Sequence, residues 1–242
     1  MLTAAALCPA PPLLARELTG ADPVVPELRQ ACLDAATELV RSDPDVVAVV
    51  GAGEHTRELG AHGRLDLTAY APALARRGSR SSGLDGAGGP DGWDERLPLS
   101  VGLGCMLLDQ AGYRGTLALH SVHDRASAGD CAALGASLAG AASRVALLVM
   151  ADGSARRSRR APGYLDVRAE PFDAEAGRAI RAGDMPALLA LDDRLAAELM
   201  ATGRAAWQVL AGAAAGRRPS CVVRYDDAPF GVGYLVASLW LG

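Results

Sequence analysis

The sequence DVVAVV at positions 45–50 decides the class of fold. It is a run of β-branched and small apolar residues without any polar–apolar alternation. A strand with one face in water alternates, whereas a strand that is covered on both faces is apolar throughout. This stretch therefore predicts a strand inside a sheet that carries helices on both faces.

Similar apolar runs follow on either side of this strand, separated by segments with helical spacing. Strand and helix alternate for most of the chain, which is typical of a mostly parallel sheet. We predict a single α/β domain over residues 1–242, with helices on both faces of a central, mostly parallel sheet. The predicted further strands are 2–8, 116–122, 145–150, 221–225 and 233–239, and the predicted helices are 26–41, 98–111, 128–142, 173–181, 185–191 and 193–214. Two segments lack such a pattern: 51–63 is predicted to be a loop, and 76–91, rich in Gly, Ser and Arg, a flexible loop.

Composition and charge exclude several classes of protein. The net charge is −4, so no basic field indicates a nucleic acid or an anionic membrane as a partner. Five cysteines stand in apolar stretches without a CxxC pair, which favours free thiols in a reducing cytoplasm. No apolar run reaches the roughly 20 residues of a membrane-spanning helix. The sequence thus predicts a cytoplasmic protein that binds a small molecule.

Candidate functional residues follow the predicted strands, because ligands of such sheets bind beyond the carboxyl ends of the strands. Glu54 and His55 come after the 45–50 strand, where an imidazole can bind a metal or act as a base. Asp152 and Ser154 come directly after the 145–150 strand. The alternative for Asp152 is an Asx turn that bonds nearby backbone N–H groups. The remaining histidines, His62, His120 and His123, are more simply interpreted as solvated or hydrogen-bonded side chains.

An arginine-rich segment follows Ser154, with four arginines at positions 156, 157, 159 and 160. Guanidinium groups suit carboxylate and phosphate ligands, so an anionic ligand is one interpretation and a solvated loop the other.

The sequence lacks the motifs of several other enzyme classes. GAG at 51–53 lacks the third glycine of a dinucleotide fingerprint, and the sequence contains no P-loop, GxSxG or HExxH.

Five stretches together resemble the LigB and Memo superfamily of class III extradiol dioxygenases. They are also similar to actinobacterial proteins that carry a LigB-like domain of this class. The stretches are AAALCPAPPLL (4–14), DVVAVVGAGEHT (45–56), VALLVMADGSARRS (145–158), ATGRAAWQVLAGA (201–213) and FGVGYLVASL (230–239). Their order and spacing along nearly the whole chain carry the resemblance.

The resemblance implies a LigB-like fold and a non-haem iron site with few of its ligands retained. Active members of the superfamily hold Fe(II) with two histidines and one carboxylate or cysteine, which leaves positions open for a catechol and O₂. The first ligand falls at Ala10, the second at His55 and the third near Thr202 or Gly203. The proton-transferring histidine falls near Arg156 or Arg157. On this alignment, His55 alone of the ligands is present.

Three functions stay open on the sequence. The first is an extradiol dioxygenase-like oxidoreductase with an altered Fe(II) site, in which His55 is both ligand and catalytic residue and Asp152 and Ser154 act on the substrate. The second is a metal-independent protein that binds a small anionic or aromatic molecule. The third is a non-catalytic interaction protein. The resemblance also implies a homodimer. The candidate ligand-binding residues are Glu54, Arg156, Arg157, Arg204 and Asp226.

Overall fold

The computed structural model describes residues 1–20, 24–61, 63–65, 67, 70 and 96–242. The predicted flexible loop at 76–91 and His62 lie outside these residues. Among the described helices, none combines the length and the apolar content that crossing a bilayer requires.

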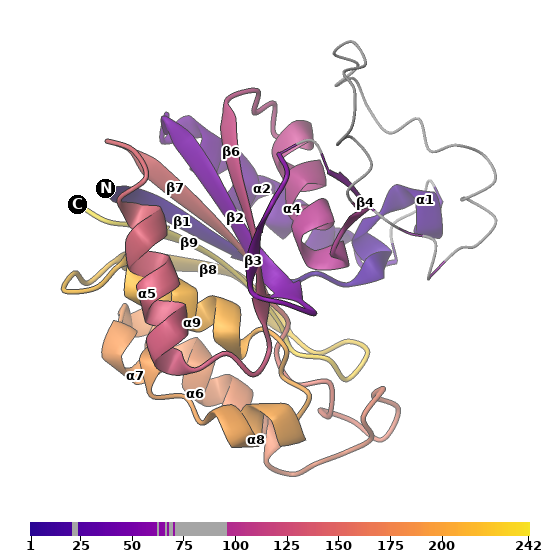
Figure 1. Cartoon of the computed structure of the whole chain (residues 1–242). Coiled ribbons are helices and arrows are strands. Elements are labelled where there is room, and N and C mark those ends of the chain that lie inside the picture. The colour runs from indigo at the N-terminus through magenta and orange to yellow at the C-terminus, as the bar shows by residue number, and fades with distance from the viewer. Residues whose placement is uncertain (21–23, 62, 66, 68–69, 71–95) are drawn as a thin grey trace.

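A seven-stranded sheet forms the centre of the molecule, in the order β3-β6-β2-β7-β1-β9-β8 (Figure 1). The four neighbouring strands β6, β2, β7 and β1 are parallel, while β3, β9 and β8 each run antiparallel to the strand beside them. This confirms the predicted fold class. The strands are β1 (Leu2–Cys8), β2 (Val46–Gly53), β3 (Arg57–Leu59), β6 (Thr116–His123), β7 (Val145–Met150), β8 (Ser220–Asp227) and β9 (Tyr234–Trp240). A separate parallel pair joins β4 (Arg64–Leu65) and β5 (Arg96–Leu97).

Helices cover both faces of the sheet (Figure 1). One face carries α2 (Pro26–Arg41) and α4 (Leu99–Gln110), near the short η1 (Pro12–Leu14) and α1 (Arg16–Thr19). The other face carries α5 (Ala128–Ala139), α6 (Ala169–Ala182), α7 (Met185–Leu189), α8 (Asp193–Glu198) and α9 (Arg204–Ala213).

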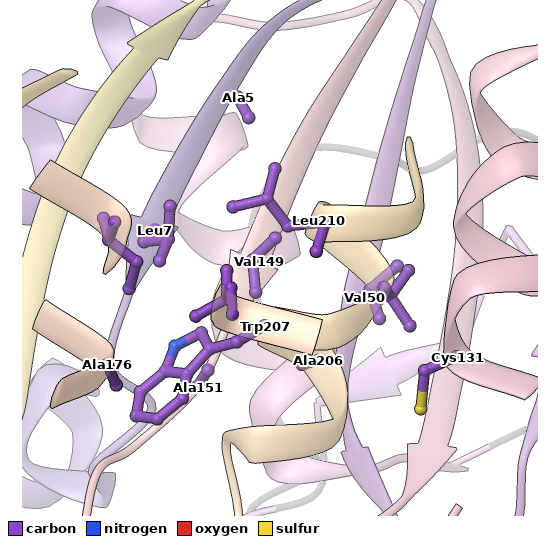
Figure 2. Close-up of a cluster of buried hydrophobic side chains, with 14 of the residues drawn as sticks. Ala5, Leu7, Val50, Cys131, Val149, Ala151, Ala176, Ala206, Trp207 and Leu210 are labelled. Carbon is purple, nitrogen blue, oxygen red and sulfur yellow. The ribbon is translucent and has the colours of Figure 1, made fainter. Parts of the chain in front are cut away.

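The central strands are apolar throughout because they contribute to two cores. All six residues of β7 are buried. In β1, Ala5 and Leu7 belong to the core under α9, and Ala6 and Cys8 belong to the core under α2. Such alternation between two covered faces is the reason that the run shows no polar period. Figure 2 shows the core under α9, with Trp207 of α9 beside Ala151 and Ala176.

Two glycines let α5 and α9 approach each other closely. A Cβ on Gly135 would lie 2.1 Å from the carbonyl oxygen of Val209, and a Cβ on Gly212 would lie 2.4 Å from the Cα of Ala132. The two helices thus touch backbone to backbone, which side chains larger than hydrogen at these positions would prevent.

Two predictions about single elements are wrong. The helix expected over 193–214 is two helices, α8 and α9, because Met200 between them takes a left-handed φ of 54°. The loop expected over 51–63 contains the end of β2 and all of β3. β3 has three residues, of which two are exposed, and so short an edge strand leaves no apolar pattern in the sequence.

Candidate functional site

The parallel strands β1, β2, β6 and β7 end side by side at one end of the sheet. After β1 and β2 the chain leads to α2 and α4 on one face, whereas after β6 and β7 it leads to α5 and α6 on the other. The chain therefore leaves the neighbouring strands β1 and β7 in opposite directions. Such a topological switch point is where open α/β sheets bind their ligands.

Asp152 stands at this switch point, two residues after the end of β7. Its Oδ1 accepts a hydrogen bond of 2.9 Å from the backbone N–H of Ala10, beyond the end of β1. Its backbone oxygen accepts one of 2.9 Å from the N–H of Gly203. Burial raises the pKa of the carboxyl group to about 6, against the opposite effect of the Ala10 hydrogen bond. Near neutral pH, Asp152 can therefore both give and take a proton.

Tyr234 and Cys32 lie within reach of the charge of the Asp152 carboxyl group, and Cys8 contacts Cys32. Burial, and after it the charge of Asp152, raises the pKa of the Tyr234 phenol. The Cys8 thiol lies 3.8 Å from the carbonyl oxygen of Cys32. The pKa of the Cys32 thiol is raised by its contact with Cys8, by burial and by the charge of Asp152. Both thiols are free and fully buried, and they pack as apolar groups.

Ser154 braces the loop that follows β7. Its hydroxyl donates a hydrogen bond of 2.7 Å to the carbonyl oxygen of Leu199 and accepts one of 3.1 Å from the N–H of Arg156. Its side chain is fully buried. With its proton engaged and no exposure to solvent, Ser154 has the contacts of a structural residue rather than of a nucleophile.

Arg157 and Asp226 line one small pocket between the β7–α6 loop (residues 151–168), α6 and β9. Arg157 Nη1 lies 3.2 Å from Oδ2 of Asp173, and Asp226 forms an ion pair with Arg181. Burial raises the pKa of Asp173, whereas its hydrogen bonds with the Ser154 N–H and Arg157 lower it. The pocket measures about 20 Å³, which is room for a water molecule. The charged side chains that line this pocket are thus already in ion pairs, Arg157 with Asp173 and Asp226 with Arg181.

Arg156 and Arg204 point their guanidinium groups at backbone oxygens. Arg156 Nε donates to the carbonyl oxygen of Gly163 at 2.8 Å. Arg204 is fully buried and donates to the carbonyl oxygens of Asp124 and Ala126 and to Gln208 Oε1. Arg204 therefore holds the loop between β6 and α5 in place through hydrogen bonds from the protein interior. Because the Arg204 side chain is fully buried, a ligand in solution does not reach it.

Glu54 and His55 lie in solvent after the end of β2. The backbone oxygen of His55 accepts a hydrogen bond of 2.7 Å from Ser121 Oγ, which fixes the main chain but not the imidazole. His120 is half-buried, and burial lowers its pKa while Glu58 opposes this. His123 Nδ1 lies 3.3 Å from Asp124 Oδ1.

The residues at the expected iron site do not fit the metal. Within the described residues, no three His, Cys, Asp or Glu side chains come together in a group that could hold a metal ion. A Cβ at Gly203 would lie 2.4 Å from the backbone oxygen of Asp152, so this position has no room for a ligand side chain. At Ala10 the backbone N–H is bonded to Asp152 instead. Position 203 therefore cannot carry a ligand side chain, and position 10 offers only the methyl group of an alanine.

The fold and the switch point define the class of protein. It is an α/β protein with a mixed central sheet and a carboxyl group at the switch point of that sheet. The uncharacterized protein JW3007 from Escherichia coli K12, known from its crystal structure, resembles this chain with a TM-score of 0.53 and 14% sequence identity. The similarity covers 98% of this chain and 99% of that chain, and at this identity it shows a common fold alone. No protein-family model and no curated protein matches the sequence.

The sequence placed Asp152 after β7 but did not predict the groups that interact with it. The Ala10 N–H is a main-chain group in a Pro-rich segment, and no side chain there indicates a contact with Asp152. Tyr234 begins the closing strand, and a polar ring at that point of an apolar run is the one signal that the sequence offers.

Proposed function

We propose that this chain is a LigB-like protein that has lost the iron site of the extradiol dioxygenases and binds a small polar molecule at Asp152 without a metal. Asp152 is a half-buried residue at the switch point, and its carboxyl group, with its raised pKa and its Ala10 hydrogen bond, carries this proposal. A metal-free site agrees with the alanine at position 10 and with the lack of room for a side chain at position 203.

The surroundings of Asp152 favour an uncharged ligand with hydroxyl or amide groups over an anion. An anion would be repelled by the ionised carboxylate, and the arginines named above already bond to Asp173, Gly163 and backbone oxygens. A phenol or an alcohol can donate to the carboxylate or accept from the carboxylic acid. Asp152 is then the residue that exchanges a proton or a hydrogen bond with the ligand.

Thermal stability in the presence of small molecules tests this proposal. Catechol, uncharged alcohols and amides, carboxylates and phosphate are added to the wild type, to Asp152→Asn and to Asp193→Asn, an exposed aspartate of α8. We expect an uncharged hydroxyl or amide compound to raise the Tm of the wild type and of Asp193→Asn alone. An equal rise in Asp152→Asn would remove Asp152 from the site.

Iron content separates this proposal from a rearranged dioxygenase site. After anaerobic reconstitution with Fe(II), mass spectrometry is expected to find far less than one iron per chain, equal in the wild type and in His55→Ala. Iron near one per chain that is lost in His55→Ala would contradict the proposal, and oxygen consumption with catechols would then be measured.

A further inference from the structure

Exposed apolar side chains gather at the carboxyl edge of the sheet. Of the nine large apolar side chains that are exposed in the described residues, five lie there. We call them the Tyr164 surface. It comprises Tyr164, Leu165 and Val167 of the β7–α6 loop, Met200 between α8 and α9, and Phe230 between β8 and β9. Exposed apolar side chains scattered singly need no explanation, but a local concentration indicates an interaction site.

The three segments that carry the Tyr164 surface contact one another. Met200 Sδ lies only 2.6 Å from the place of a Cβ on Gly163, so its side chain lies on the β7–α6 loop. A Cβ on Gly231 would lie 2.6 Å from the Cβ of Ala161, and the N–H of Arg157 donates to the oxygen of Gly231 at 2.9 Å. The three segments therefore pack against one another at this end of the molecule.

Hydrogen bonds hold the β7–α6 loop in one shape. The Asp166 side chain is 14% exposed and accepts hydrogen bonds from the N–H and the Nε of Arg168, at 2.9 and 3.0 Å. Leu165 and Val167, on either side of Asp166, are 50% and 82% exposed. A loop with a fixed shape loses little conformational entropy when a partner binds.

Backbone strain supports the same interpretation. Tyr164 has a φ of 58° and Met200 a φ of 54°, and they are two of the three non-glycine residues in the left-handed region among the described residues. Side chains other than glycine rarely adopt this conformation. Strain of this kind is concentrated at functional sites, where the surrounding structure holds the residue in place.

Two arginines beside the apolar side chains have no acidic partner. Arg159 and Arg160 are exposed, and their guanidinium groups form no ion pair or hydrogen bond within the described residues. The other arginines of the loop are paired: Arg156 and Arg168 with Asp166, and Arg157 with Asp173. The Tyr164 surface thus offers apolar contacts and two free positive charges.

We propose that the Tyr164 surface docks an acidic, apolar segment of a partner protein. Tyrosine and arginine are enriched among the residues that contribute most to protein–protein binding. A phosphate polyanion or an anionic bilayer requires a broad basic field, which two free arginines on a chain of net charge −4 do not provide. The proposal does not depend on the chemistry of Asp152.

Labelled synthetic peptides test the proposal by fluorescence anisotropy. The probe is a short peptide of alternating Asp and Leu, and the controls replace Asp with Lys or Leu with Ser. We expect the wild type to bind the Asp–Leu peptide in preference to both controls. The double variant Arg159→Glu/Arg160→Glu should bind it at least about tenfold more weakly and prefer the Lys–Leu peptide instead. Val167→Ser should bind several-fold more weakly.

The matched control is Arg41→Glu, an exposed arginine at the end of α2, beside the opposite edge of the sheet. It should bind the Asp–Leu peptide like the wild type. A wild type without preference for the Asp–Leu peptide, or an equal loss in Arg41→Glu, would overturn the proposal. So would a dimer in sedimentation that Val167→Ser dissociates, or binding to vesicles of anionic lipid that the arginine variants abolish, because each assigns the surface to another occupant.

Discussion

Asp152 is the residue whose protonation links the candidate site to the stability of the fold. Its pKa is about 6 in the folded protein, against an ordinary value of 3.8. The folded state therefore binds more protons than the unfolded state between these values, and the stability falls as the pH rises through this window. The contribution is fully present below about 3.8 and lost above about 6.

We expect Asp152→Asn to raise the free energy of unfolding at about pH 8 and to change that free energy little at about pH 4. Asparagine keeps an acceptor for the Ala10 N–H but has no charge to bury. The gain is about 3 kcal/mol at most, from the difference between the two pKa values. Urea unfolding at both pH values measures it. Equal effects at both would mean that Asp152 ionises in the fold as it does in water.

The position of these side chains could be predicted from the sequence, but not their direction. Asp152 and Ser154 follow a recognisable strand, which places both beyond its carboxyl end. Yet the Asp152 carboxyl group meets Ala10, whereas the Ser154 hydroxyl turns inward to Leu199. The helix predicted over 193–214 put Arg204 in its interior, whereas Arg204 begins α9 and points into the protein. Direction depends on contacts between distant segments, which one sequence does not display.

Among the elements, those with long apolar runs or clear helix signals could be predicted to the residue. β1, α2 and β7 have the predicted bounds, since prolines and charges flank them. The break between α8 and α9 was missed because it depends on Met200, a good helix former that the tertiary contacts of Gly163 and Ser154 force out of the helix.

The contact between α5 and α9 gives a prediction about a single methyl group. Gly135→Ala should destabilise the protein by about 3 kcal/mol, because the new Cβ meets the backbone of α9, which cannot move aside. Gly129→Ala on the same helix meets nothing closer than 3.8 Å and should stabilise it by about 0.5 kcal/mol. Thermal unfolding of both variants compares them. A Gly135→Ala variant as stable as the wild type would show that the helices can separate without cost.

On the scale of the whole molecule, the sheet depends on pairs of strands from opposite ends of the chain. β1 lies between β7 and β9, and Ala4 is paired with both Ala146 and Trp240. The apolar runs in the sequence predicted strands but not their neighbours, because a strand covered on both faces looks the same at any interior position of a sheet.

Removal of β9 should therefore unfold the whole protein rather than leave a smaller folded domain. A chain that ends at Asp227 leaves one side of β1 unpaired and β8 without its partner. We expect it to lose its cooperative thermal transition in circular dichroism, whereas a chain that lacks only the exposed Gly242 should keep it. A cooperative transition in the shorter chain would show that β8 and β9 are an appendage to the fold.

The pairing of β1 with β9 also sets the order of events during synthesis on the ribosome. The apolar strand Leu2–Cys8 leaves the exit tunnel well before its partners, which are made more than 130 residues later. At roughly 5–20 residues per second, this strand waits several seconds or longer with both edges open. Nascent chains of this protein should therefore bind chaperones through the Leu2–Cys8 segment, and release should coincide with the emergence of Tyr234–Trp240.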